Sequence, residues 1–325
     1  MLLRVHLDTD IGGDIDDLCA LALLLTAPTV TITGITTVLE EQGQRAGYAR
    51  YVLALAGRTA IPVAAGADLS LGRWRLPAGL PPADRYWPQP VPPAPGPLTA
   101  ALDLLAQSIA QGAVVVGIGP WTNLALLEQR FPGLLGQTRL YLMGGTIHSP
   151  PPGFPDDRAL VDYNLQADPE AAAIVLQSAT PTLVPLAVTV QTALRRAHLP
   201  ALHRSGPLGR LIARQARAFA ADERPAERDR RTWAGLPPDF INFQHDPLTV
   251  AVALGWPGVA IATRPLAFDQ PTGRLVATDR GRPTPVVTAV DGEAFSRYWL
   301  GTVTARRKAP GDRRPGGTVA RDPGL

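Results

Sequence analysis

The chain has 325 residues, of which 46% are hydrophobic and 18% are charged, and its formal net charge is +3. This composition indicates a globular protein with a sizeable core. It does not indicate a nucleic-acid partner, because many arginines fall in two segments, 223–231 and 305–314, and no basic stripe alternates with aromatic residues. No apolar run is long enough for a signal sequence or a membrane span, so we expect no membrane partner. The single cysteine, Cys19, leaves no intramolecular disulfide and fits a reducing cytoplasm.

Apolar runs alternate with helical patterns along most of the chain. In chain order the pattern predicts a strand at 2–7, a helix at 16–25, a strand at 30–38, a helix at 45–55, a strand at 60–64, a helix at 98–110, a strand at 113–118, a helix at 122–128 and a strand at 139–143. Strand, helix, strand at this spacing predicts an α/β fold with a single open, mostly parallel sheet and helices on both faces. Binding sites in such sheets form in the crevice beyond the carboxyl ends of the strands.

Two proline-rich segments interrupt this pattern, at 72–97 and 146–160, and we expect each of them to be a long loop. Residues 265–290 are typical of short antiparallel strands around turns. From about residue 305 the sequence becomes rich in glycine, proline and arginine. It therefore predicts one domain over 1–304 and a disordered tail over 305–325.

A cluster of carboxylates follows the first predicted strand directly. The segment 8–17 reads DTDIGGDIDD, and it places five acids within ten residues: Asp8, Asp10, Asp14, Asp16 and Asp17. Carboxylates this crowded repel one another, and burying them is costly unless a cation compensates their charge. Clustered oxygen donors suit a hard cation, Ca²⁺ or Mg²⁺, better than zinc. The loop therefore predicts a metal site.

Three other motifs share features with this loop. Acids at a helix N-terminus complement the helix dipole, but one or two would serve that purpose and five exceed it. An EF-hand loop that starts at Asp8 would need glutamate at its twelfth position, where Cys19 stands. A metal-dependent phosphatase, with Asp8 as nucleophile and Asp10 as acid, stays open as an alternative, although it leaves Asp16 and Asp17 unexplained.

Considered with the rest of the chain, this loop resembles the signature of the inosine–uridine-preferring nucleoside hydrolases, a DTDxGxDD-like loop after the first strand that here carries two additional residues. Four further blocks match the family in order: ITTV at 35–38, AGRTAIPVAAGAD at 56–68, LMGG at 142–145 and HDPL at 245–248. The resemblance covers about residues 3–304. It implies a Rossmann-like catalytic domain that needs Ca²⁺ and hydrolyses the N-glycosidic bond of a ribonucleoside or related N-riboside to free base and ribose. It also implies a homodimer or homotetramer.

The resemblance further implies which residues hold the metal and carry the chemistry. Ca²⁺ would be bound by Asp10, Asp17, Asp246 and the main-chain carbonyl of Thr122. Because a bound dication lowers the pKa of its water toward neutrality, Asp10 would take the proton of the attacking water as general base. The attack on the anomeric carbon would pass through an oxocarbenium-like transition state. His245, in HDPL, would protonate the departing base, because imidazole titrates near neutral pH.

The ribose would be held by side chains from two segments. By the resemblance, Asp16 would lie beside the metal and hydrogen-bond the ribose hydroxyls. Because of the two-residue insertion, Asp14 is the alternative residue for this role. The segment DYN at 162–164 matches the family's Glu-Phe-Asn, so Asp162 and Asn164 are expected to bind ribose hydroxyls as well. A helix-entry turn would also explain this segment.

The chain departs from the family after ITTV, where Glu41 stands in place of an asparagine that reaches the pocket. A carboxylate there adds negative charge beside the ribose and favours a substrate with a cation or extra donors. We therefore expect N-ribosyl hydrolysis with altered specificity, in which inosine and uridine are poor substrates. The same departure keeps a second alternative open, a non-catalytic protein of this fold that binds a nucleoside or ribose without turnover.

Overall fold

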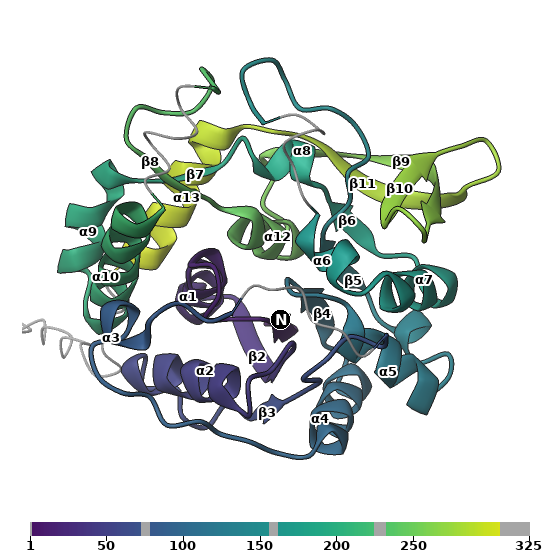
Figure 1. Ribbon diagram of the computed structural model, residues 1–325, viewed down its shortest axis with the longest axis horizontal. Coiled ribbons are helices and arrows are strands. Elements are labelled where there is room, and N and C mark those ends of the chain that lie inside the picture. Colours follow the sequence, from purple (N-terminus) through teal and green to yellow (C-terminus); the bar gives the residue numbers. More distant parts are fainter. Residues whose placement is uncertain (1, 73–78, 156–161, 224–231, 306–325) are drawn as a thin grey trace, which may run out of the picture.

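In a computed structural model, which describes residues 2–72, 79–155, 162–223 and 232–305, nine strands form one central sheet. Their order across the sheet is β10 (Arg274–Ala277), β9 (Val259–Asp269), β11 (Arg282–Val290), β6 (Thr182–Val184), β5 (Leu140–Met143), β4 (Val114–Gly117), β1 (Leu3–Thr9), β2 (Val30–Thr37) and β3 (Val63–Ala65). Pairing is parallel from β11 through to β3, and β9 pairs antiparallel with both β10 and β11. The predicted single, mostly parallel sheet is therefore confirmed (Figure 1).

Helices cover both faces of this sheet, as predicted. They are α1 (Asp16–Thr26), α2 (Gln44–Leu55), α3 (Ala83–Tyr86), α4 (Leu98–Ala110), α5 (Thr122–Arg130), α6 (Tyr163–Ala167), α7 (Pro169–Ser178), α8 (Leu186–Thr189), α9 (Leu199–Arg204), α10 (Pro207–Asp222), α12 (His245–Ala253) and α13 (Gly292–Thr304), with short 3₁₀ turns η1 (Leu135–Gln137) and η2 (Arg196–His198). A separate antiparallel pair joins β7 (Ala193–Arg195) to β8 (Phe240–Phe243).

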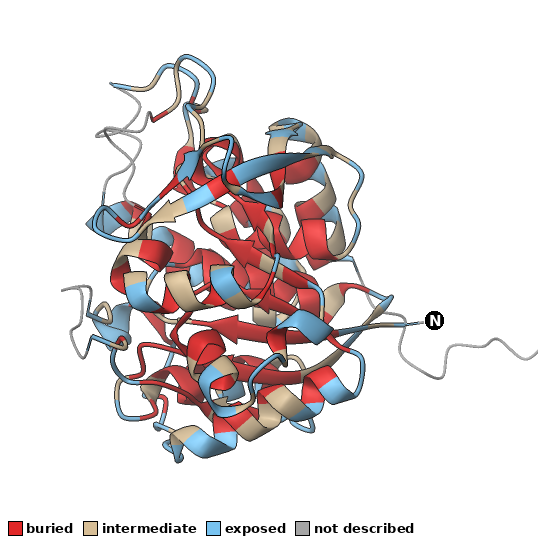
Figure 2. Cartoon of the chain, turned by 90° about the vertical axis from the view of Figure 1, so that its right-hand side faces the viewer, coloured by how far each residue is buried: buried red, intermediate tan, exposed pale blue. Residues whose placement is uncertain are grey.

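The packing of β4 explains why two layers of helices are needed. Val114 and Val116 lie in one apolar cluster with residues of α1 and α12, whereas Val115 lies in a second cluster with residues of α4, α5 and α7. Alternate residues of a strand point to opposite faces, so a strand that is apolar throughout must be covered on both. Figure 2 accordingly shows the central strands buried, with exposed residues on the outer helices, in loops and on edge strands.

The strand order places a crevice at the carboxyl end of β1. The chain leaves β1 for β2 on one side, and β4 later pairs with β1 on the other side. Loops that leave two such strands run in opposite directions, and the gap between them is where ligands bind in open α/β sheets. The acidic loop, which begins directly after Thr9, lies at this point of the sheet.

Helix α1 is buried on every side. All of its residues from Leu18 to Leu25 are buried, and both α12 and α13 pack against it. The indole nitrogen of Trp299, in α13, donates to the main-chain oxygen of Cys19 at 3.1 Å. A helix that is apolar all round belongs inside a core. Its first turn, with two aspartates, is therefore held inside the molecule rather than at the surface.

Some predicted boundaries differ from those observed. The strand predicted at 60–64 lies at Val63–Ala65, because the preceding residues turn, with the amide of Ile61 bonded to the carbonyl of Arg58 at 3.1 Å. The antiparallel strands predicted within 265–290 begin at Val259 and join the central sheet. Residues 306–325 of the predicted tail lie outside the described residues, and the single domain over 1–304 stays a prediction. Across the described residues, no helix is long and apolar enough to span a membrane.

Candidate functional site

A cavity of about 360 Å³ opens beyond the carboxyl ends of β1, β4 and β5, and we call it the acidic cavity. Five acids line it: Asp10, Asp14, Asp16, Asp17 and Asp246. Asn164 and His245 line it too. The fold thus gathers these seven predicted residues from three distant parts of the chain into one place.

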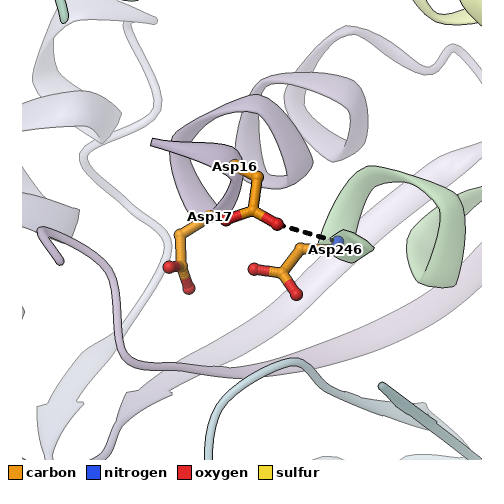
Figure 3. Close-up of side chains that lie close together, drawn as sticks. All are labelled: Asp16, Asp17 and Asp246. Carbon is orange, nitrogen blue, oxygen red and sulfur yellow. Dashed lines mark hydrogen bonds between the residues drawn. The ribbon is translucent and has the colours of Figure 1, made fainter. Parts of the chain in front are cut away.

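Three of the acids converge because two helices begin there. Asp16 and Asp17 occupy the first turn of α1, and Asp246 occupies the first turn of α12, which packs against α1 (Figure 3). One carboxylate oxygen from each lies within 4.8 Å of those from the other two. The amide of Asp246 donates to Asp16 Oδ2 at 3.2 Å, and the hydroxyl of Thr9 donates to Asp17 Oδ1 at 2.5 Å. Helix N-termini favour negative charge, so both helix dipoles support this cluster.

The three carboxylates are electrostatically costly as they stand. Burial, and then repulsion from neighbouring aspartates, raises the pKa of Asp16, Asp17 and Asp246 well above the usual range. Hard oxygen donors that lie this close and repel one another fit a dication such as Ca²⁺. The residues present therefore fit the metal that the resemblance implies.

Asp10 lies between the end of β1 and the turn that follows β4. A Cβ added at Gly119 would come within 2.9 Å of Asp10 Oδ1 and 3.0 Å of its amide nitrogen, so only glycine leaves room for this side chain. Burial raises the pKa of Asp10, and the nearby guanidinium of Arg45 opposes that shift. A carboxylate with a raised pKa is a stronger base.

Asp14, the alternative to Asp16 for the place beside the metal, is held differently from it. Its Oδ1 accepts from the side-chain amide of Asn242, in β8, and from the amide of Ile15, both at 2.5 Å. The residue is exposed at the rim of the acidic cavity, whereas Asp16 is buried inside it. The position of Asp16 next to Asp246 favours it over Asp14 for the place beside the metal.

His245 lies at the first position of α12, with one ring nitrogen engaged. Its Nδ1 is hydrogen-bonded to the hydroxyl of Thr189 at 2.6 Å. Burial lowers the pKa of His245 to about 4, so the neutral imidazole is the form present near pH 7. Nε2 is then the ring nitrogen left to meet a ligand in the acidic cavity.

The segment from Asp162 to Asn164 divides into two parts. Asn164 lines the acidic cavity, and its amide nitrogen donates to the carbonyls of Ile118 and Met143 at 2.9 and 3.3 Å. Asp162 instead accepts from the amides of Gly145 at 2.5 Å and Leu165 at 3.3 Å, and it caps α6. Burial raises the pKa of Asp162 to about 6. Asp162 therefore has the helix-entry contacts, and its ribose contact stays a prediction.

Three predicted site residues, Thr122, Glu41 and Asp162, lie outside the cavity lining, and the lining also includes residues that were not predicted. The hydroxyl of Thr122 donates to Asp168 at 2.6 Å, and Glu41 lines a neighbouring hollow with Tyr48. The lining includes Ile118 and Arg45, which the sequence reasoning missed. Ile118 carries no side-chain signal for a main-chain role. A signal for Arg45 did exist, because a cation in the first turn of a helix opposes the helix dipole.

A comparison with known protein families agrees with this geometry. The model of the family described as inosine-uridine preferring nucleoside hydrolase matches residues 5–297. The chain belongs to this family. The matched span includes both the acidic loop and the HDPL segment, so the resemblance inferred from those motifs is confirmed.

Individual nucleoside hydrolases are similar to this chain as well. The pyrimidine-specific ribonucleoside hydrolase RihA of Escherichia coli is 32% identical over 193 residues, which make up 57% of this chain and 60% of that protein. A plant nucleoside hydrolase, 22% identical, superposes with a TM-score of 0.76 over 94% of this chain and 100% of its own. A purine-preferring ribonucleoside hydrolase from Gardnerella vaginalis, also 22% identical, gives a TM-score of 0.72 over 93% and 98%. The structural likenesses confirm the predicted nucleoside hydrolase fold.

Proposed function

We propose that this chain is a calcium-dependent nucleoside hydrolase, which cleaves the N-glycosidic bond of a ribonucleoside or related N-riboside to free base and ribose. The observation that carries the proposal is the meeting of Asp16 and Asp17, from α1, with Asp246, from α12, in the acidic cavity. Buried carboxylates gathered from distant parts of a chain need compensation, and a bound dication supplies it. Membership of the family supports the N-ribosyl reaction.

The proposed metal ligands are Asp10, Asp17 and Asp246, with Asp16 beside them. For the main-chain carbonyl we propose Ile118, because it lines the cavity and Thr122 does not. The Ile118 carbonyl accepts from Asn164, and a carbonyl oxygen has a second lone pair to offer. When bound, the dication lowers the pKa of water toward neutrality and fixes vicinal ribose hydroxyls.

The side chains of the cavity divide the remaining work. Asp10 accepts the proton of the attacking water, and Asp16 and Asn164 bond the ribose hydroxyls, which orients the anomeric carbon. Negative charge around the ring stabilises the oxocarbenium-like transition state. His245 meets the departing base through Nε2 as a neutral imidazole, because burial disfavours the imidazolium, and it donates there in the tautomer whose Nδ1 accepts from Thr189.

Two alternatives are less well supported. A phosphatase would need Asp8 as an exposed nucleophile, but Asp8 is buried and its Oδ1 accepts from Thr36 at 2.5 Å and Asn123 at 2.8 Å. A non-catalytic binding protein would rest on the replacement of an asparagine by Glu41, but the clustered acids, Asn164 and His245 all still line the acidic cavity. The altered specificity that we propose rests on the same replacement.

Release of free base from a panel of nucleosides, with and without a calcium chelator, tests the proposal. We expect hydrolysis of at least one purine, pyrimidine or cationic N-riboside, loss of activity in chelator and recovery on adding calcium. Inosine and uridine should be slow, and Glu41→Asn should speed them. Equal, efficient inosine turnover by both proteins would remove the specificity proposal. Binding without base release, or phosphate release from nucleotides instead, would remove the hydrolase proposal.

The proposal also covers the oligomeric state and the cellular compartment of the enzyme. The family resemblance supports a homodimer or homotetramer. The single cysteine, Cys19, is buried and free, which suits a reducing cytoplasm.

A further inference from the structure

A buried arginine connects two loops of the acidic cavity. Arg45, the second residue of α2, is only 2% exposed, yet it lines the cavity. Arginine is almost never this buried unless its charge and its donors are satisfied. The partners of this guanidinium therefore show what the residue does.

All of the hydrogen bonds described for the guanidinium are to main-chain carbonyls. Nε donates to the carbonyl of Leu39 at 2.9 Å, and Nη1 donates to the carbonyls of Asp10 and Ile11, the latter at 3.3 Å. Leu39 follows β2, and the other two residues begin the acidic loop after β1. Within the described part of the chain, no ion pair involves Arg45. Its charge acts on the carboxylates of both Asp10 and Asp17, where it opposes the rise in pKa that burial causes, rather than on one partner.

The main chain at Arg45 is also held by hydrogen bonds. The carboxylate of Glu40, itself buried, accepts from the amides of Arg45 at 3.2 Å and Ala46 at 2.8 Å and from the hydroxyl of Thr37. Leu39, whose carbonyl receives Nε, has a φ of 48°, in the left-handed region that non-glycine residues seldom adopt. A conformation of this kind persists only where its surroundings over-determine it.

We infer that Arg45 is a positioning residue, which holds the peptide groups after Asp10 so that the acidic loop is in its ligating conformation before calcium arrives. The inference rests on the proposed function. The fork geometry of guanidinium allows one side chain to donate to both loops at once, and lysine, with a single ammonium, cannot reproduce this bridge.

Charge and positioning make opposite predictions for calcium affinity. A positive charge next to the acids repels a dication, so its removal alone would tighten calcium binding. Loss of the bridge frees the loop, and calcium binding must then order it, which weakens the affinity. The direction of the change in Arg45→Gln therefore separates the two effects.

Isothermal titration of calcium into the folded variants tests the inference. The net free energy of a hydrogen bond from a charged donor corresponds to a factor of about ten to a hundred in a binding constant. We therefore expect the calcium affinity of Arg45→Gln and Arg45→Lys to fall by about tenfold to a hundredfold. Arg50→Lys is the matched control. Arg50 lies on the same helix and also donates to a carbonyl, that of Val63 at 3.2 Å, but outside the acidic cavity, so its replacement should leave calcium affinity unchanged.

A kinetic measurement excludes a role in folding alone. The calcium concentration that gives half-maximal rate should rise by the same factor in the Arg45 variants, and the rate at saturating calcium should approach that of the unaltered protein, because bound calcium then orders the loop. A folding defect alone would lower the rate at every calcium concentration. Unchanged or tighter calcium binding by both Arg45 variants would overturn the inference and leave the proposed function standing. Absence of calcium binding by the unaltered protein would overturn both.

Discussion

Asp10→Asn should lower kcat by about a thousandfold, because a positioned general base contributes about 10²- to 10⁴-fold and the amide cannot accept the proton. The substitution preserves the shape of the side chain, which lies against Gly119. The main-chain carbonyl of residue 10 still accepts the hydrogen bond from Arg45. The fold should therefore be retained. Initial rates of base release at saturating calcium, together with thermal unfolding of the same sample, measure the two effects separately.

Asp14→Asn is the control for this substitution. Asp14 belongs to the same loop, but it lies at the rim and bonds Asn242 and the amide of Ile15. We expect a loss of kcat below about tenfold, since an amide oxygen can accept the same bonds. If Asp10→Asn kept more than a tenth of the activity, Asp10 would not be the base.

The metal-free protein should become less stable as the pH rises above about 4, the pKa of an unfolded aspartate. The pKa values of Asp16, Asp17 and Asp246 are raised in the folded state, mainly by burial, whereas unfolded aspartates titrate near about 3.9. Over this range the folded state keeps protons that the unfolded state has released, so the free energy of unfolding falls with increasing pH. Calcium at about one hundred times its Kd should add about 2.7 kcal/mol. Denaturant unfolding across pH, with calcium or chelator, measures both effects.

Asp246→Asn should weaken both effects, the loss of stability with rising pH and the stabilisation by calcium. Removing one buried charge should make the protein more stable in chelator and flatten its pH dependence, and most of the stabilisation by calcium should disappear. Asp103→Asn, at a half-exposed carboxylate that pairs with Arg130 on the surface, should change neither. A calcium effect that survives in Asp246→Asn would place the ion elsewhere.

The sequence carried enough information for the sheet but less for its edges. Long apolar runs such as 113–118 predict buried parallel strands well, because such strands are apolar on both faces. The strand β6, only three residues long, has too short a pattern to be recognised. Residues 259–264 were missed because this part of β9 lies near the edge of the sheet, where much of it is exposed and periodicity is weak.

The site was predictable where function resides in side chains of unusual composition. Five acids in ten residues have few explanations, and the HDPL segment identified their distant partner. Main-chain contributions were not predictable in this way, because the carbonyl of Ile118 looks like any other carbonyl in a sequence. Arg45 gave a signal, a cation in the first turn of a helix, but its partners are three carbonyls, and only the fold shows that they belong to two loops.

Diffraction from crystals grown with ample calcium tests most directly whether acids from distant parts of the chain bind a single dication. We expect one ion in the acidic cavity, with oxygens of Asp17 and Asp246 both at about 2.3–2.6 Å from it. Asp17 and Asp246 lying far apart, or an empty space between them, would contradict it.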